Sequence, residues 1–269
     1  MNIKNIINYT ILLIVILSLI YLISVKWVNG HKSEIWKPKI GSTWYWQLDG
    51  PINTSRDADV YDIDLEKTPK SVIDELHKKG KKVICYINVG AWENFRADSN
   101  KFPKDVIGNQ LNGWIDERWL DIKHFNKFKD IIEKRFDMAA KKGCDAIEPD
   151  NIDAYIHDTG FNISYEDQIV YNKWLANEAH KRNLSIGLKN DVDQVNELVN
   201  YFDFAINEEC FKYNECEKLL PFIKNGKAVF HVEYDIEPNI FCKTTLAMGF
   251  SSIKSDKSLN GYVIQCKNQ

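Results

Sequence analysis

The residues best suited to chemistry in this 269-residue chain are carboxylic acids that follow short apolar runs. Glu148-Pro149-Asp150-Asn151 closes one such run, and Asn207-Glu208-Glu209 closes another. Residues two apart on a strand point the same way, so Glu148 and Asp150 can face one side together. Mutual repulsion raises one pKa of a carboxylate pair, which leaves a protonated acid beside an ionised one. This pattern favours cleavage of a glycosidic bond, which needs a proton donor and a nucleophile or base.

Further polar and aromatic residues lie near the same predicted strand ends. A lysine at an inward-facing strand end needs an acid partner, so Lys189 is expected to neutralise one carboxylate unless it is a solvated loop residue. Aromatic rings stack on the apolar faces of sugars, although half of these rings would simply pack in the core. The predicted substrate-binding residues are Trp46, Asp62, Tyr86, Trp119, Glu148, Asn151, Lys189, Glu233 and Tyr234.

The residue pattern leaves the choice among neighbouring acids open. Strict alternation puts Glu208 and Glu209 on opposite faces of a strand, and the periodicity does not say which of them faces inward. Any single acid could instead cap a helix or pair with a lysine, and Asp153 fits the first turn of a helix. The sequence has no metal-ligand spacing, no P-loop and no G-x-S-x-G motif. We therefore expect no metal and no cofactor.

The elements that must position these residues are strands that alternate with helices. Eight strands in this length favour a single-domain α/β fold, the (β/α)8 TIM barrel, preceded by an N-terminal hydrophobic helix. A doubly wound sheet is the alternative, but no G-x-G-x-x-G motif follows the first strand. Residues 92–123 are expected to form one long loop. Strands are predicted at 44–48, 60–65, 82–90, 146–150, 185–189, 204–208, 228–234 and 251–253, and helices at 69–79, 126–142, 165–182, 192–200 and 215–225.

The N-terminal segment indicates an extracytoplasmic protein. Residues 6–25 carry no charge, and about 20 apolar residues can span a bilayer as a helix. A cleaved signal usually has a shorter apolar region and small residues before the cut, so an uncleaved signal-anchor is slightly favoured. We expect residues 1–27 to be a signal-anchor or signal peptide, residues 28–42 a short linker, and residues 43–269 the hydrolase domain. The domain would be membrane-anchored or secreted.

Charge and cysteine usage agree with that compartment. The chain has 35 Lys and Arg against 38 Asp and Glu, a net charge of −3, and the two lysines before residue 28 leave the remainder at −5. A mildly acidic body argues against a nucleic-acid partner. Six cysteines in an oxidising space suggest disulfides. The expected pairs are Cys210–Cys216 and Cys242–Cys266, with buried thiols at Cys85 and Cys144.

Several longer motifs, in order, resemble one family of carbohydrate-cleaving enzymes. They include Trp44-Tyr45-Trp46-Gln47-Leu48, Gly143-Cys144-Asp145-Ala146-Ile147-Glu148-Pro149-Asp150-Asn151 and Asn207-Glu208-Glu209-Cys210-Phe211. This run of motifs looks like the endo-α-1,4-polygalactosaminidases, glycoside hydrolase family 114, over about residues 43 to 255. The resemblance implies a (β/α)8 barrel that cleaves inside α-1,4-linked galactosamine-containing chains. It also implies that Asp150 and Glu208 are the catalytic pair.

Two departures from the family pattern leave the specificity open. Tyr86-Ile87-Asn88-Val89-Gly90-Ala91 stands where the family often reads Tyr-Phe-Ser-Ala-Gly-Ser, and Ile115-Asp116 replaces Pro-Gly before Glu117-Arg118-Trp119. The alternatives are a glycosidase for another amino-sugar or neutral glycan, and a membrane-tethered, non-catalytic glycan-binding barrel. A metal-dependent carbohydrate deacetylase is a weaker one. The expected partner is a polysaccharide, with membrane contact only through an uncleaved N-terminal helix and no protein partner implied.

Overall fold

The structure is a computed structural model that describes residues 13–20 and 34–267. The chain divides into two units, residues 1–34 and residues 35–269. Residues 13–20 are helical. Within the described ranges, no helix is long and apolar enough to cross a membrane. Residues 1–12 and 21–27 of the expected hydrophobic helix and residues 28–33 of the expected linker lie outside the described residues, so both remain predictions.

Eight parallel strands follow one another around the second unit in sequence order, as a (β/α)8 barrel requires. Each neighbouring pair from the first strand to the last is hydrogen-bonded in parallel register. The strands are β1 (Trp44–Gln47), β2 (Val60–Asp64), β3 (Lys82–Asn88), β7 (Ala146–Asp150), β8 (Ser185–Lys189), β9 (Phe204–Glu208), β10 (Val229–Glu233) and β11 (Ser251–Ser255). The barrel predicted from the sequence is confirmed.

A short antiparallel strand, β12 (Val263–Gln265), fills the gap between the last and first barrel strands. It pairs with β11, and the Gln265 side chain donates a hydrogen bond to the Trp44 carbonyl of β1. The Gly261 carbonyl accepts from the Tyr45 hydroxyl at 3.1 Å. Gly261 has a φ of +101°, and a Cβ there would lie 2.4 Å from that hydroxyl, so this close approach requires glycine. The segment after β11 therefore closes the barrel.

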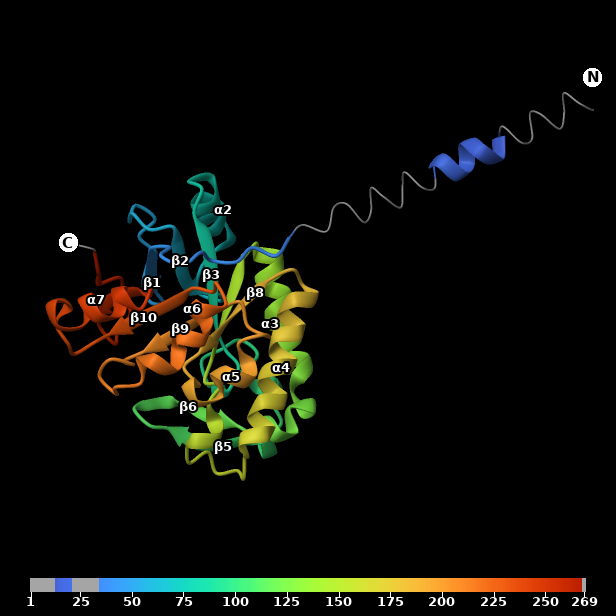
Figure 1. Cartoon of the computed structure of the whole chain (residues 1–269). Coiled ribbons are helices and arrows are strands. Elements are labelled where there is room, and N and C mark those ends of the chain that lie inside the picture. Colours follow the sequence, from blue (N-terminus) through green and yellow to red (C-terminus); the bar gives the residue numbers. More distant parts are fainter. Residues whose placement is uncertain (1–12, 21–33, 268–269) are drawn as a thin grey trace, which may run out of the picture. The chain divides into compact units, whose positions relative to one another are not determined.

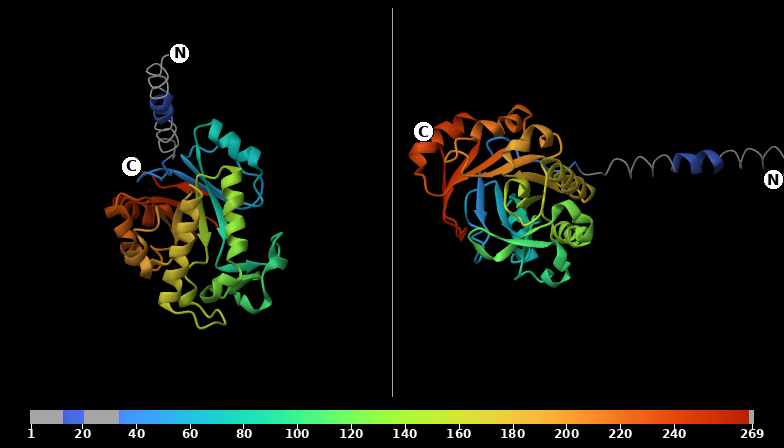
Figure 2. Two further views of the ribbon diagram at one scale, coloured as in Figure 1. Left: turned by 90° about the vertical axis from the view of Figure 1, so that its right-hand side faces the viewer. Right: turned by 90° about the horizontal axis from the view of Figure 1, so that it is seen from below.

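Helices cover the outside of the barrel, and the apolar residues divide into two clusters accordingly. Trp44, Phe204 and Phe230 belong to the cluster that fills the barrel interior, whereas a larger cluster lies between strands and helices. α3 (Lys129–Lys142) and α4 (Tyr165–Lys181) lie side by side on the outer surface (Figures 1 and 2). The other α-helices are α2 (Lys70–Lys78), α5 (Val195–Leu198), α6 (Leu220–Lys224) and α7 (Pro238–Ala247). The 3₁₀ helices are η1 (Ser99–Lys101), η2 (Lys104–Val106), η3 (Ile122–Lys127), η4 (Ala154–Ile156), η5 (Val192–Gln194) and η6 (Cys216–Leu219).

The region expected to be one long loop, residues 92–123, instead contains a small antiparallel sheet. Its strands are β4 (Ala91–Glu93), β5 (Ile107–Leu111) and β6 (Trp114–Leu120), in the order β4-β6-β5. In Figure 1, β5 and β6 lie at one end of the barrel. The expectation of an unstructured loop was wrong, because backbone pairing of β6 with both neighbours satisfies its polar groups.

Three disulfides join all six cysteines. The expected pairs Cys210–Cys216 and Cys242–Cys266 are confirmed. The expectation of thiols at Cys85 and Cys144 was wrong, because the two are bonded to each other between β3 and the start of β7. These two strands are neighbours in the sheet, so the bond ties adjacent parts of the barrel. Three disulfides are typical of a protein from an oxidising, extracytoplasmic space.

Candidate active site

A cavity of about 940 Å³ opens at the carboxyl ends of the barrel strands. Its floor comes from the ends of β1, β3, β7, β8 and β9, and part of its wall comes from the β4–β6 sheet. Eight acidic side chains line it, against four Lys or Arg side chains. In a barrel of this kind the active site lies at this face. The cavity is therefore a negatively charged pocket in the place where catalysis is expected.

Lys189, at the end of β8, is the centre of the charged groups on the floor. Its Nζ lies 2.8 Å from Glu148 Oε1, 3.0 Å from Asp150 Oδ1 and 3.3 Å from Glu208 Oε2. The side chain is only 3% exposed, and the ammonium lies 5.2 Å from the centre of the Trp46 ring. Burial alone would lower the pKa of Lys189, but the three carboxylates outweigh it and raise that pKa well above its ordinary value. Lys189 is therefore a permanent cation.

Asp150 ends β7 and is held by donors on both carboxylate oxygens. Lys189 contacts Oδ1, while the Tyr86 hydroxyl donates to Oδ2 at 2.9 Å and the Asn151 amide at 3.3 Å. Burial first, and then the Asp150 charge, raises the pKa of Tyr86 well above its usual range, so the phenol keeps its proton. Both carboxylate oxygens of Asp150 thus accept hydrogen bonds from protein groups.

Glu208 ends β9 and faces the same cavity. The Tyr234 hydroxyl donates to Oε1, and the Asn190 amide donates to Oε2 at 3.3 Å. Asn190 Oδ1 also accepts from the backbone N–H of Glu208 at 2.9 Å. Asp150 Oδ1 and Glu208 Oε2 lie 3.0 and 3.3 Å from the same Lys189 nitrogen, so they are at most 6.3 Å apart, the sum of the two distances.

The ambiguity between Glu208 and Glu209 is resolved by the backbone. Glu209 has a φ of +63° and turns its carboxylate to Lys212, at 2.7 Å, instead of lining the cavity. Left-handed residues also follow the other two strands: Asn151 after β7 and Asn190 after β8. Such backbone strain at non-glycine residues concentrates at functional sites, where surrounding bonds maintain it.

Two predicted substrate-binding acids, Asp62 and Glu148, lie below the cavity and not in its wall. Both are fully buried. Neither oxygen of Asp62 has a hydrogen-bond partner among residues 34–267, nor does Glu148 Oε2. Burial first, and then repulsion by Glu148, raises the pKa of Asp62 well above its usual value. Because Lys189 bonds Glu148 and not Asp62, the proton resides on Asp62, which can donate it to Glu148.

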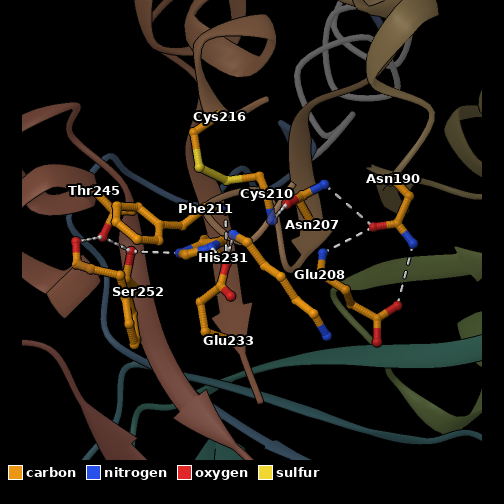
Figure 3. The surroundings of a disulfide bond; sticks show 12 residues. Asn190, Asn207, Glu208, Cys210, Phe211, Cys216, His231, Glu233, Thr245 and Ser252 are labelled. Atoms are coloured by element: carbon orange, nitrogen blue, oxygen red, sulfur yellow. Dashed lines mark hydrogen bonds and ion pairs between the residues drawn. A yellow bond between two sulfur atoms is a disulfide. The ribbon is translucent and has the colours of Figure 1, made fainter. Parts of the chain in front are cut away.

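Glu233 is not brought to the cavity. It points to the outer side of β10, where its Oε1 lies 2.8 Å from His231 Nε2 and accepts from the Phe211 N–H at 2.9 Å. Its neighbour Tyr234 points the other way, to Glu208. Figure 3 shows Glu233 beside His231, and Glu208 beside Asn190. Glu233 therefore supports the loop that follows Glu208 and has no access to a substrate in the cavity.

Of the remaining predicted residues, Tyr234 contacts Glu208 without lining the cavity, and the others line it together with some that the sequence did not reveal. Trp46, Tyr86, Trp119, Asn151 and Lys189 line it, and Trp119 stacks on His157 with ring centres 4.7 Å apart. Asn190 and Glu117 were missed as site residues. A polar residue directly after a strand was the available signal for Asn190, whereas Glu117 depends on the unpredicted β4–β6 sheet.

One cluster in residues 34–267 has metal-ligand spacing, namely Cys210, Cys216 and His231. Its two sulfurs are bonded to each other, so they are not free thiolates and offer no site for an ion.

Barrel, acidic cavity and a lysine-bridged carboxylate pair at the strand ends together define a glycoside hydrolase. The chain belongs to glycoside-hydrolase family GH114, whose model matches residues 26–269. It is 38% identical to Ega3 of Aspergillus fumigatus, solved in complex with galactosamine, with a TM-score of 0.83 over 87% of this chain and 99% of that one.

The glycoside hydrolase domain of PelA from Pseudomonas aeruginosa has a TM-score of 0.64 over 82% of this chain and 96% of that one. At 12% identity, this likeness shows the shared fold alone. Comparison with curated proteins gave no match.

Proposed function

We propose that this enzyme hydrolyses α-1,4-linked galactosamine-containing polysaccharide at internal bonds, with Asp150 and Glu208 as the catalytic pair. The observation that carries the proposal is the placement of both carboxylates in one cavity on a common lysine. The substrate class is supported by family membership and by the 38% identity to a protein solved with galactosamine. A pocket with eight acids against four Lys or Arg side chains attracts a cationic amino-sugar chain.

The contacts favour Asp150 as nucleophile and Glu208 as acid and base. Asp150 has a donor within 3.0 Å on each oxygen, which stabilises the ionised form. The contacts from Lys189 and Asn190 to Glu208 Oε2 are 3.3 Å, and this side chain is 28% exposed against 20% for Asp150. Glu208 Oε2 is therefore the more suitable atom to carry a proton that is passed to the leaving oxygen.

We propose a retaining reaction, because Asp150 Oδ1 and Glu208 Oε2 share the Lys189 nitrogen and this pair of oxygens is at most 6.3 Å apart. Retaining enzymes place their carboxyls about 5–5.5 Å apart, whereas inverting ones need about 6.5–9.5 Å to admit a water. In the first step Asp150 forms a bond to the anomeric carbon, and the leaving oxygen takes the proton of Glu208. In the second step a water gives its proton to Glu208 and displaces Asp150.

The cavity is larger than one sugar ring, as an enzyme that cuts within a chain requires. Its rim carries exposed Phe95 and Trp114, which are placed to stack on outer sugars of the chain. We further propose that the N-terminal segment directs this domain outside the cytoplasm, as a membrane anchor or as a signal for secretion. The support is the uncharged run of residues 6–25 together with the three disulfides.

The test is product analysis by mass spectrometry after incubation of the full chain with α-1,4-linked polygalactosamine. We expect short oligosaccharides from the wild type, and activity lowered by about a thousandfold or more in Asp150→Asn and Glu208→Gln. Glu209→Gln is the matched control, because Glu209 is adjacent in sequence but bonded to Lys212 outside the cavity lining. Activity in folded Asp150→Asn would overturn the assignment, and a wild type active only on a neutral glycan would overturn the substrate class.

A further inference from the structure

Glu117 is a buried acid in the wall of the cavity, beside the proposed nucleophile. It lies on β6, is 8% exposed, and lines the cavity. Its Oε2 accepts from the Asn88 side chain at 3.1 Å. Asn88 is the register partner of Asp150 on the neighbouring strand. Glu117 is thus one hydrogen bond away from the residue directly beside Asp150.

A second acid lies opposite Glu117. Glu93 of β4 is its cross-strand partner, and directly opposed like charges destabilise a sheet. Arg96 compensates Glu93 with contacts of 2.7 and 2.9 Å, but the same guanidinium also binds Asp64 at 2.8 and 3.0 Å. Arg96 is therefore occupied by two carboxylates, and Glu117 makes no ion pair within residues 34–267.

Glu117 is exceptional among the acids that line the cavity. Asp158 also has no cation partner in the described structure, but it is exposed and screened by water. Glu117 is therefore the one buried lining acid in residues 34–267 without a cation. The paired ones are Asp49 with Lys67, Asp64 and Glu93 with Arg96, Asp150 and Glu208 with Lys189, and Asp153 with His157.

A positively charged ligand would supply the missing partner. We propose that Glu117 is the binding site for a protonated primary amino group on the sugar that occupies the catalytic position, so that it selects free amino sugars over N-acetylated ones. C2, the carbon that carries the amino group, is bonded to the anomeric carbon that Asp150 attacks, and Glu117 is bonded to Asn88, the register partner of Asp150. Glu117 Oε1, which has no hydrogen-bond partner among residues 34–267, is free to accept from it. This inference rests on the proposed function and names the group that confers its specificity.

An N-acetyl group does not replace the ammonium here. It carries no charge, so it cannot compensate the acids around Glu117, and its methyl group would take up space beside a carboxylate. A charge-assisted hydrogen bond in a buried site is stronger than a neutral one, which provides the discrimination. The selectivity therefore comes from Glu117 in the cavity wall, and not from Asp150 and Glu208 on the cavity floor.

The proton content of Glu117 makes this testable. Burial first, then the charges of Glu93 and Asp150, raise the pKa of Glu117 to about 8, against the smaller opposing effects of Arg96 and Asn88. At about pH 6.5 the carboxyl of the empty site is protonated. An arriving ammonium favours the ionised form, so the proton leaves as the amino sugar binds.

The experiment is isothermal titration calorimetry of the full chain with galactosamine and with N-acetylgalactosamine, at about pH 6.5 in two buffers of different ionisation enthalpy. We expect galactosamine to bind with net release of a proton, and N-acetylgalactosamine to bind more weakly with no release. Glu117→Gln should lose the release and about tenfold or more of the affinity for galactosamine, with little change for the acetylated sugar. Asp116→Asn is the matched control, because Asp116 neighbours Glu117 on β6 but bonds Asn94 and does not line the cavity.

Wild-type binding of galactosamine without proton release, or an unchanged preference in folded Glu117→Gln, would overturn the inference. The wild-type proton count needs no variant and so decides the question even if Glu117→Gln does not fold. Cleavage of polygalactosamine is measured in parallel. If the polymer is cleaved but Glu117→Gln keeps the wild-type preference, only the role of Glu117 falls; if neither sugar binds and the polymer is intact, the proposed function falls with it.

Discussion

Replacing Asp62 by asparagine is expected to keep the enzyme folded and active while changing how its stability depends on pH. Asp62 is fully buried beneath the proposed catalytic pair, and its raised pKa leaves it neutral beside Glu148. The amide group of an asparagine is neutral, has nearly the same shape, and donates a hydrogen bond to the same unpartnered Glu148 oxygen. We therefore expect kcat/KM of Asp62→Asn to stay within about threefold of the wild type.

The size of the stability effect follows from one proton. An aspartate in an unfolded chain ionises near pH 3.9, whereas the folded protein keeps this proton to a much higher pH. The stability due to Asp62 is complete below about pH 4 and is lost as pH rises towards its folded pKa, at about 1.4 kcal/mol per pH unit. Asp62→Asn lacks this proton, so its advantage over the wild type should grow by about 1.4 kcal/mol for each pH unit between the unfolded and the folded pKa, or about 3–6 °C in Tm per unit.

Urea unfolding of the two proteins at about pH 5, 6 and 7, followed by tryptophan fluorescence, measures this difference. Asp57→Asn is the control, because Asp57 is fully exposed, and it should show no such trend. A difference that stays flat or shrinks as pH rises would mean that Asp62 is ionised in the folded protein, and the account of a shared proton with Glu148 would fail.

Three other predictions concern the reaction, the cavity rim and the barrel wall. The first product released should keep the anomeric configuration of the substrate, by NMR of an early time point, because Asp150 and Glu208 lie within 6.3 Å; inversion would exclude Asp150 as nucleophile. Trp114→Ala should raise KM for the polymer about fivefold or more but leave short substrates unaffected, since this ring is 55% exposed at the rim; equal effects on both would refute an outer subsite. The double change Cys85→Ala and Cys144→Ala should cost about 4 kcal/mol in urea unfolding, given a 59-residue separation, and an unchanged midpoint would contradict that estimate.

The barrel was predictable from the sequence because its strands are buried on both faces. Ala146–Asp150, Ser185–Lys189 and Phe204–Glu208 occupy the expected bounds, since each is a short apolar run between helical stretches. Gly143, in the left-handed conformation after α3, marks a helix end in the same way. Local sequence signals of this kind predict the structure correctly because tertiary packing favours the same conformation.

Elements held by distant contacts were not predictable. β12 has three residues and exists because it fills the opening between β11 and β1. α7 was missed because its Asn, Cys and Thr residues have low helix propensity, and its helical conformation depends on packing against β11. In β5, Gly108, Asn109 and Gln110 have no strand pattern, and their pairing with β6 supplies the order.

The direction of side chains at the strand ends was only partly predictable. Glu233 and Tyr234 were both expected at the substrate, yet neighbours on a strand point to opposite faces, so one of them had to be wrong. The alternation of side chains along a strand does not say which of two neighbours faces inward. The inward direction of Tyr234 became clear only from its hydrogen bond to Glu208. The place of Glu117 at the cavity could not be predicted from its own segment, since it depends on the pairing of β4 with β6.

The groups behind β9 and β10 hold Glu208, the proposed acid, in place. The Cys210 N–H donates to Asn207 Oδ1 at 3.0 Å, and the Asn207 amide donates to Asn190 Oδ1 at 3.4 Å. Asn190 in turn binds both the backbone and the carboxylate of Glu208 (Figure 3). The Cys210–Cys216 disulfide and the bond from Phe211 to Glu233 fix the other end of this chain of hydrogen bonds. An acid that must release and regain a proton works only in a defined position. We therefore expect these buried contacts to serve the proposed role of Glu208, whose carboxylate faces the cavity on the other side of the strand.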